Sequence, residues 1–185
     1  MNASALLLPH RCVVVSRQAL QQLRASLERG TGIQSATYLQ EAGFAGGESV
    51  YNAFTEWTVT NYRVEKPADL DVQFLGEALS GFFQEFGWGT LVPDQLSGAV
   101  ISLDSANWAE ADGEAQAQYP SCHFTCGLLA DFLGRLVGSL VGVMEVECRS
   151  RGDEHCRFLA GSPETVHGIY ERMNQGQSYQ QALGV

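Results

Sequence analysis

Apolar residues recur at intervals of three and four along several segments of the chain, with polar residues between them. This periodicity is typical of amphipathic helices, because it places the apolar side chains on one face. In the first segment Leu20, Leu23 and Leu27 form the apolar stripe, and Arg24 is expected on the outer side. The segments predicted to be helical are 18–29, 33–62, 67–86, 121–137, 163–175 and 178–183.

Shorter apolar runs predict the strands, at residues 11–16, 88–93, 98–104, 141–148 and 154–160. The last two runs flank Gly152 and Asp153, a turn pair that accepts positive φ. Helices are followed by a meander of strands, a helix, a hairpin and a final helix. This order indicates an α+β fold with an antiparallel sheet and helices packed largely on one face.

Three glycines, Gly43, Gly46 and Gly47, interrupt the long helical pattern of residues 33–62. Each glycine in a helix interior costs about 1 kcal/mol relative to alanine. Either the helix breaks here or the backbone of another element crosses it closely. No dinucleotide or phosphate-binding motif accompanies these glycines, which argues against a phosphate loop.

The chain has 185 residues, of which 45% are hydrophobic, so a single globular domain over residues 1–185 is expected. The net charge is −10 and Lys66 is the single lysine, so binding to nucleic acid or to an anionic membrane surface is not expected. No stretch reaches the ~20 apolar residues of a membrane span. The first residues make a poor signal peptide. Five cysteines without an export signal favour thiols or metal ligands over disulfides, and we expect a cytoplasmic protein.

Two cysteines are placed symmetrically about the predicted hairpin turn. Cys148 and Cys156 each lie four residues from Gly152, which makes them cross-strand neighbours if the strands fold back evenly. Their Cβ atoms would then be roughly 4.5–5.5 Å apart. That separation suits two thiolates on one tetrahedral zinc, at about 2.3 Å each, and also permits a disulfide.

Spacing alone leaves the remaining ligands open. Glu145 and Cys148 face opposite sides of a regular strand, so they reach one ion only if the strand bulges or ends between them. Glu147 is the rival carboxylate. Upstream, Cys122 and Cys126 lie one turn apart at the start of a predicted helix, and either could reach the hairpin. Residue 121, a serine, is the expected N-cap of that helix.

These residues resemble the 4-vinyl reductase (4VR) domain family, whose members include hydrocarbon-binding and aromatic-sensor domains, and more distantly the TRAPP vesicle-tethering subunits. The likeness is strongest over residues 35–160, with 1–34 and 161–185 as flanking elements. The resemblance implies a structural zinc that closes the β-hairpin, because four protein ligands leave no open coordination position. The positions that match the family's ligands are Cys122, Glu145, Cys148 and Cys156.

The resemblance also implies that this is a non-catalytic domain that binds a hydrophobic or aromatic molecule or a tetrapyrrole. Such a domain would act as a sensor, carrier or accessory protein, as a homodimer and with a separate protein partner. Pockets of this kind are mostly apolar and aromatic. The side chains expected to line it are Phe82, Phe83, Phe86, Trp88, Trp108 and Phe132.

Two alternatives come from the same resemblance. One is an accessory or catalytic component of vinyl reduction in chlorophyll or other tetrapyrrole metabolism. Hydride transfer needs a cofactor, and the sequence has no dinucleotide fingerprint, so we favour a protein that is not an enzyme. The other is a TRAPP-like assembly module. The phenol-sensing branch is expected to hold its ligand with a histidine on the helix of residues 71–87, which here has none; its polar members are Gln73 and Glu77.

Overall fold

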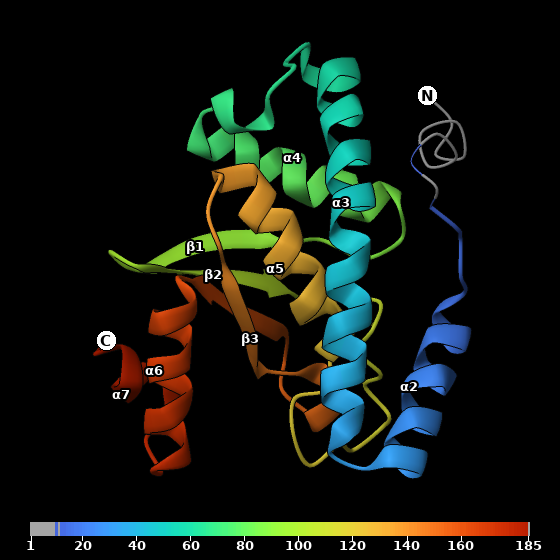
Figure 1. Cartoon of the computed structure of the whole chain (residues 1–185), viewed down its shortest axis with the longest axis vertical. Coiled ribbons are helices and arrows are strands. Elements are labelled where there is room, and N and C mark those ends of the chain that lie inside the picture. Colours follow the sequence, from blue (N-terminus) through green and yellow to red (C-terminus); the bar gives the residue numbers. More distant parts are fainter. Residues whose placement is uncertain (1–9, 11, 185) are drawn as a thin grey trace.

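The computed structural model describes residue 10 and residues 12–184 (Figure 1). The α-helices are α2 (Arg17–Thr31), α3 (Gln34–Tyr62), α4 (Val72–Glu85), α5 (His123–Val137), α6 (Pro163–Asn174) and α7 (Tyr179–Leu183). The strands are β1 (Val92–Ser97), β2 (Val100–Ser105), β3 (Gly142–Glu147) and β4 (Cys156–Gly161). Two 3-10 turns complete the fold, η2 (Pro67–Asp69) and η3 (Arg149–Arg151). In this part of the chain, no helix is both long enough and apolar enough to cross a membrane.

The strands form one antiparallel sheet in the order β1-β2-β4-β3. The β3–β4 hairpin pairs Glu145 with Phe158 and Glu147 with Arg157, so the register shifts between the two glutamates. This irregularity is the bulge that a shared site for Glu145 and Cys148 requires. The turn contains Gly152 at a φ of 100°. The structure thus confirms the predicted α+β fold with an antiparallel sheet.

The sheet separates two hydrophobic layers (Figure 1). Leu103, Phe158 and Ala160 face the larger core, which they share with α3, α4 and α5. Val100 and Leu159 face the opposite side, where α6 and α7 cover them. Alternation along each strand produces this division, because successive side chains point to opposite faces. Three of the helices therefore form the main layer on one face of the sheet.

A close helix crossing explains the glycines of the long segment. Helix α3 runs unbroken through Gly43, and α5 crosses it there. A Cβ atom added at Gly43 would lie 2.0 Å from the carbonyl oxygen of Phe124, and one at Gly127 would lie 1.9 Å from that of Gln40. The backbones can approach this closely only where side chains are absent. Of the two interpretations of the glycines, the crossing is the correct one.

The first predicted strand is wrong for residues 12–16, which form no regular structure. Ser16 instead caps α2 by accepting a hydrogen bond from the backbone of Ala19. Arg11, the first residue of that predicted strand, lies outside the described residues, as do residues 1–9. The next strand, β1, begins later than expected because Gly87 and Gly89, both at positive φ, prolong the turn after α4.

Candidate metal centre and apolar groove

Three cysteines and one glutamate converge where the start of α5 meets the end of the hairpin. Cys122 precedes α5, Glu145 lies in β3, Cys148 follows β3, and Cys156 begins β4. One ligand atom from each of the four lies within 4.8 Å of all the others. The three cysteines are fully buried. This cluster could hold a metal ion.

The sulfur geometry fits a tetrahedral ion. The Sγ atoms of Cys122 and Cys148 are 3.9 Å apart. Two thiolates bound to one zinc at about 2.3 Å in tetrahedral geometry lie about 3.8 Å apart. The hairpin and the helix start therefore hold the sulfurs close to the spacing that a shared ion requires.

The carboxylate of Glu145 supplies a second test of fit. Its Oε2 atom accepts a hydrogen bond of 2.8 Å from the backbone N–H of Cys122. Its Oε1 atom is buried and has no hydrogen-bond partner. A buried oxygen without a partner costs free energy unless something compensates it. A cation inside the cluster would provide that compensation.

Burial governs the protonation of the cluster. Removal from water raises the pKa of the Cys122 thiol and that of the Glu145 carboxyl. Hydrogen bonds from Cys122 and Cys156 lower the pKa of Cys148 instead. Without a cation, the four groups cannot all carry a negative charge in this environment. Metal binding here would release protons.

The structure also places the alternatives that spacing left open. Cys126, one turn along α5, is buried in the hydrophobic core and is not part of the cluster. Glu147 belongs to a separate polar network, where it accepts a hydrogen bond of 2.7 Å from Tyr179 and lies 2.8 Å from the His155 ring. The bulge before Glu147 gives the two glutamates these different surroundings.

Arg24 is a residue that the sequence pattern misplaced. It was expected on the outer side of α2, but it is only 4% exposed. Its Nη1 atom donates to the hydroxyl of Ser121 at 2.7 Å and to that of Ser150 at 3.3 Å. Ser121 precedes the cluster residue Cys122, and Ser150 lies in the hairpin turn. Arg24 thus ties the N-terminal helix to both sides of the cluster.

The N-terminus of α5 is capped from a distance. Ser121 is not the N-cap; Cys122 occupies that position without a side-chain hydrogen bond. The fully buried carboxylate of Glu110 accepts hydrogen bonds from the backbone N–H groups of Phe124 at 3.0 Å and Thr125 at 2.8 Å. A carboxylate at a helix N-terminus also interacts favourably with the helix dipole. The nearest local signal, the serine before the helix, gave no indication of this.

Replacing Glu110 by glutamine is expected to change how stability depends on pH. Burial raises the pKa of Glu110 from 4.5 to about 7, against the effect of hydrogen bonds from Thr125 and Phe124. The folded state therefore retains a proton that the unfolded state releases, so this group stabilises the fold fully below pH 4.5 and progressively less up to about pH 7. The free-energy difference between wild type and Glu110→Gln should shift against wild type by about 1 kcal/mol per pH unit across that range.

Urea unfolding of both proteins at matched pH values measures this difference. Glu164→Gln, at an exposed position on α6, is the control and should give no such slope. A constant difference between wild type and Glu110→Gln would contradict the assignment.

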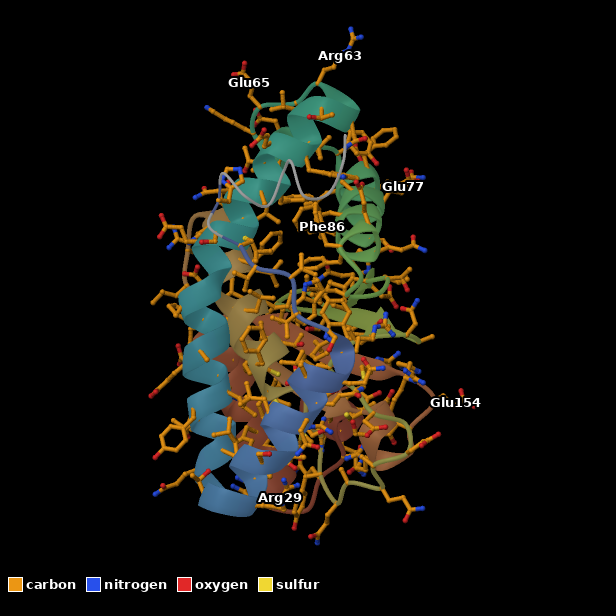
Figure 2. The ribbon with its side chains drawn as sticks, turned by 90° about the vertical axis from the view of Figure 1, so that its right-hand side faces the viewer. Arg29, Arg63, Glu65, Glu77, Phe86 and Glu154 are labelled. Carbon is orange, nitrogen blue, oxygen red and sulfur yellow. The ribbon has the colours of Figure 1, made fainter. Side chains whose placement is uncertain are left out.

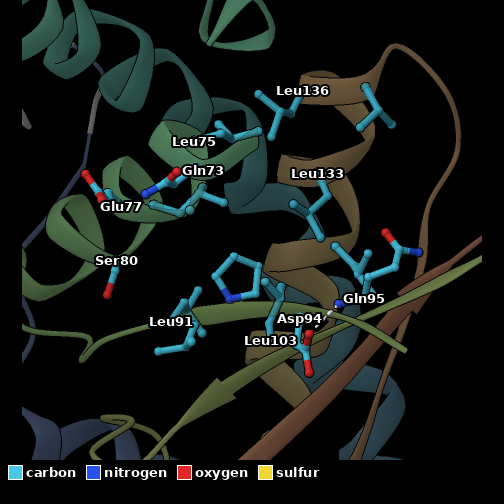
Figure 3. A pocket seen from close by; sticks show the side chains of 16 residues that line it. Gln73, Leu75, Glu77, Ser80, Leu91, Asp94, Gln95, Leu103, Leu133 and Leu136 are labelled. Carbon is cyan, nitrogen blue, oxygen red and sulfur yellow. Dashed lines mark hydrogen bonds between the residues drawn. The ribbon is translucent and has the colours of Figure 1, made fainter. Parts of the chain in front are cut away.

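An apolar groove of about 570 Å³ lies between α4, the β1–β2 hairpin and α5 (Figure 3). Leucines from three of these elements dominate its wall, with polar side chains from α4 and β1 among the remaining lining residues. The apolar lining residues are Leu75, Leu79, Leu91, Val92, Pro93, Ile101, Leu103, Leu133, Leu136 and Val137. The polar ones are Gln73, Glu77, Ser80, Asp94 and Gln95.

None of the six aromatic residues proposed as ligand contacts lines this groove. Four of them are almost fully buried, namely Phe82, Phe83, Trp108 and Phe132. The ring of Phe83 lies 5.6 Å from that of Trp108 and 5.5 Å from that of Phe132. Trp88 packs against Trp108 at 5.6 Å, and Phe86 lies between α3 and α4 (Figure 2). These rings fill the space between the helices with one another.

The fold and the cluster define a class of α+β domain in which a helix start and a β-hairpin bring three cysteines and a glutamate together. Residues 103–162, which include the whole cluster, match the family model of the vinyl-4-reductase (4VR) domain. This match confirms the resemblance to the 4-vinyl reductase domain family.

Similar proteins were found at the level of both sequence and structure. The uncharacterised protein MJ0745 of Methanocaldococcus jannaschii is 31% identical over 80 residues, 43% of this chain and 42% of that protein. The match thus spans less than half of that curated relative. The phenol-responsive sensory domain of the transcription activator PoxR, crystallised with phenol, has a TM-score of 0.61 at 20% identity, over 83% of this chain and 77% of that one.

A trafficking protein particle complex subunit 3 from Naegleria fowleri, covalently bound to palmitic acid, also has a TM-score of 0.61, at 14% identity, over 78% of this chain and 91% of that one. Both structural matches show a shared fold.

Proposed function

We propose that this chain is a non-catalytic domain that binds a hydrophobic small molecule in the groove between α4, β1–β2 and α5. The observation that carries the proposal is the groove itself, whose wall is mainly apolar and whose volume is about 570 Å³. Small-molecule sites typically measure about 300–1,000 Å³ and combine apolar walls with a few polar groups. The two structural matches support the proposal, since one was crystallised with phenol and the other carries palmitic acid.

We also propose that Cys122, Glu145, Cys148 and Cys156 hold a structural zinc ion. Thiolate and carboxylate ligands in a closed set of four are typical of such sites, and a bound zinc contributes to folding. The zinc would fasten the start of α5 to the hairpin, and α5 forms one wall of the groove. The metal would thus support the ligand site from a distance.

The biological role that this proposal favours is that of a sensor, carrier or accessory protein in the cytoplasm, organised as one domain over residues 1–185. Helix α3 exposes Tyr38, Phe44 and Val59, which supports a surface for a second copy or a separate partner. The same observation favours the TRAPP-like assembly role as the second candidate. The six core aromatic residues remain proposed contacts only for a ligand that separates their rings. A tetrapyrrole would be such a large ligand.

Filling the groove is expected to abolish ligand binding while leaving the fold intact. Leu75 is only partly buried and lines the groove, so Leu75→Trp should occupy its space. Titration with 1-decanol, followed by calorimetry, should show at least about ten-fold weaker binding in this variant, because the added ring competes for the apolar volume. Leu140→Trp, at a position 79% exposed and outside the groove, is the matched control. Equal affinities for the two variants would sink the proposed site.

A further inference from the structure

The polar side chains of the groove carry negative charge or no charge. Among the described residues that line it, Glu77 and Asp94 are carboxylates, and none is a lysine, arginine or histidine. Both carboxylates are exposed, and Glu77 projects outward from α4 (Figure 2). A ligand whose apolar part enters the groove would therefore place its polar end near two negative charges.

The nearby donors that could receive an anion are already engaged. The N-terminus of α4 is capped by the side chain of Asp71, which accepts a hydrogen bond of 3.1 Å from the backbone of Gln73. Asp71 thus adds a third carboxylate at this end of the groove. On α5, Arg135 forms ion pairs with Asp131 at 2.7 Å and Glu48 at 3.3 Å. Its charge is therefore directed toward α3.

The charge of the whole chain acts in the same direction. The net charge is −10, so the field around the molecule repels anions at long range. An ionised carboxylate that enters an apolar groove loses water contacts, and here it would find no cationic partner to replace them. An uncharged polar end avoids both costs and can still bond to Gln73, Ser80 or Gln95 at the rim.

We infer that the groove selects apolar molecules without a negative charge and rejects those that end in a carboxylate. The inference rests on the proposed function and narrows its ligand class. Hydrocarbons and neutral phenols fit this rule, whereas free fatty acids and tetrapyrroles with ionised propionates do not.

A pair of ligands with the same tail tests the inference. At pH 7, 1-decanol is neutral and decanoate is ionised, so calorimetric titration of the zinc-loaded protein compares the two end groups on one apolar chain. We expect 1-decanol to bind at least about ten-fold more tightly, given two carboxylates within several ångströms of the end group. Decanoate that binds as tightly as 1-decanol would overturn the inference and leave the groove as a binding site. A wild-type protein that binds neither would overturn the proposed function and the inference together.

Neutral isosteres separate the local charges from the net charge. In Glu77→Gln/Asp94→Asn, the ratio of the two affinities should narrow by about five-fold or more. Glu164→Gln/Glu171→Gln removes the same charge from exposed positions on α6, which packs on the opposite face of the sheet, and should leave the ratio nearly unchanged. Equal narrowing in both double variants, or none in the first, would contradict the role of Glu77 and Asp94.

Discussion

Cys148→Ser is expected to lose the bound metal and to unfold at a markedly lower temperature. Cys148 is fully buried within the cluster, and its Sγ atom lies 3.9 Å from that of Cys122. A serine hydroxyl is a poor zinc ligand, and its loss of metal leaves the buried Glu145 carboxyl without compensation. Because metal binding is coupled to folding, the loss should reach at least about 3 kcal/mol, or roughly 6–12 °C in melting temperature at this chain length.

The matched control is Cys12→Ser. Cys12 is partly exposed and lies outside the cluster, so this variant should keep one zinc per chain and the wild-type melting temperature. Metal content by atomic emission and thermal unfolding by circular dichroism measure both quantities. A Cys148→Ser protein with full zinc content and unchanged melting would mean that the cluster is not a structural metal site.

Gly127→Ala should be the most destabilising single-methyl change on α5. The new Cβ atom would lie 1.9 Å from the carbonyl oxygen of Gln40, so α3 and α5 would have to move apart along their whole contact. Backbone atoms cannot rotate away as a side chain can, and we expect a loss of at least about 3 kcal/mol.

Gly46→Ala provides the comparison within the same helix pair. Its Cβ atom would meet nothing nearer than a Leu128 methyl group at 3.7 Å, an ordinary contact. Alanine also has the higher helix propensity, so Gly46→Ala should stabilise the protein by up to about 1 kcal/mol. Chemical unfolding of both variants measures the contrast. Similar free energies of unfolding for the two would show that α3 and α5 do not cross as described.

The local signals in the sequence were sufficient for most of the elements. Helical periodicity located α2 to α7, and the turn pair at Gly152 located the β3–β4 hairpin. The spacing of Cys148 and Cys156 correctly indicated that they face each other. The choice of Glu145 over Glu147 needed the family resemblance, because a bulge cannot be read from side-chain alternation.

Features that depend on contacts between distant segments were not predictable in the same way. Arg24 reads as a surface residue of α2, since periodicity does not show that a loop with Ser121 folds over it. Glu110 caps α5 from a separate segment, and capping rules consider only neighbouring residues. An aromatic-rich helix such as α4 can equally line a cavity or fill one. Here Phe82 and Phe83 fill the core, while leucines line the groove.

The most direct test of the account is native mass spectrometry of the purified protein after incubation with zinc and 1-decanol. The account predicts a mass above that of the denatured chain by one zinc ion per chain and by a bound molecule of 1-decanol. A native protein with the mass of the bare polypeptide under these conditions would contradict both the structural metal site and the apolar ligand groove.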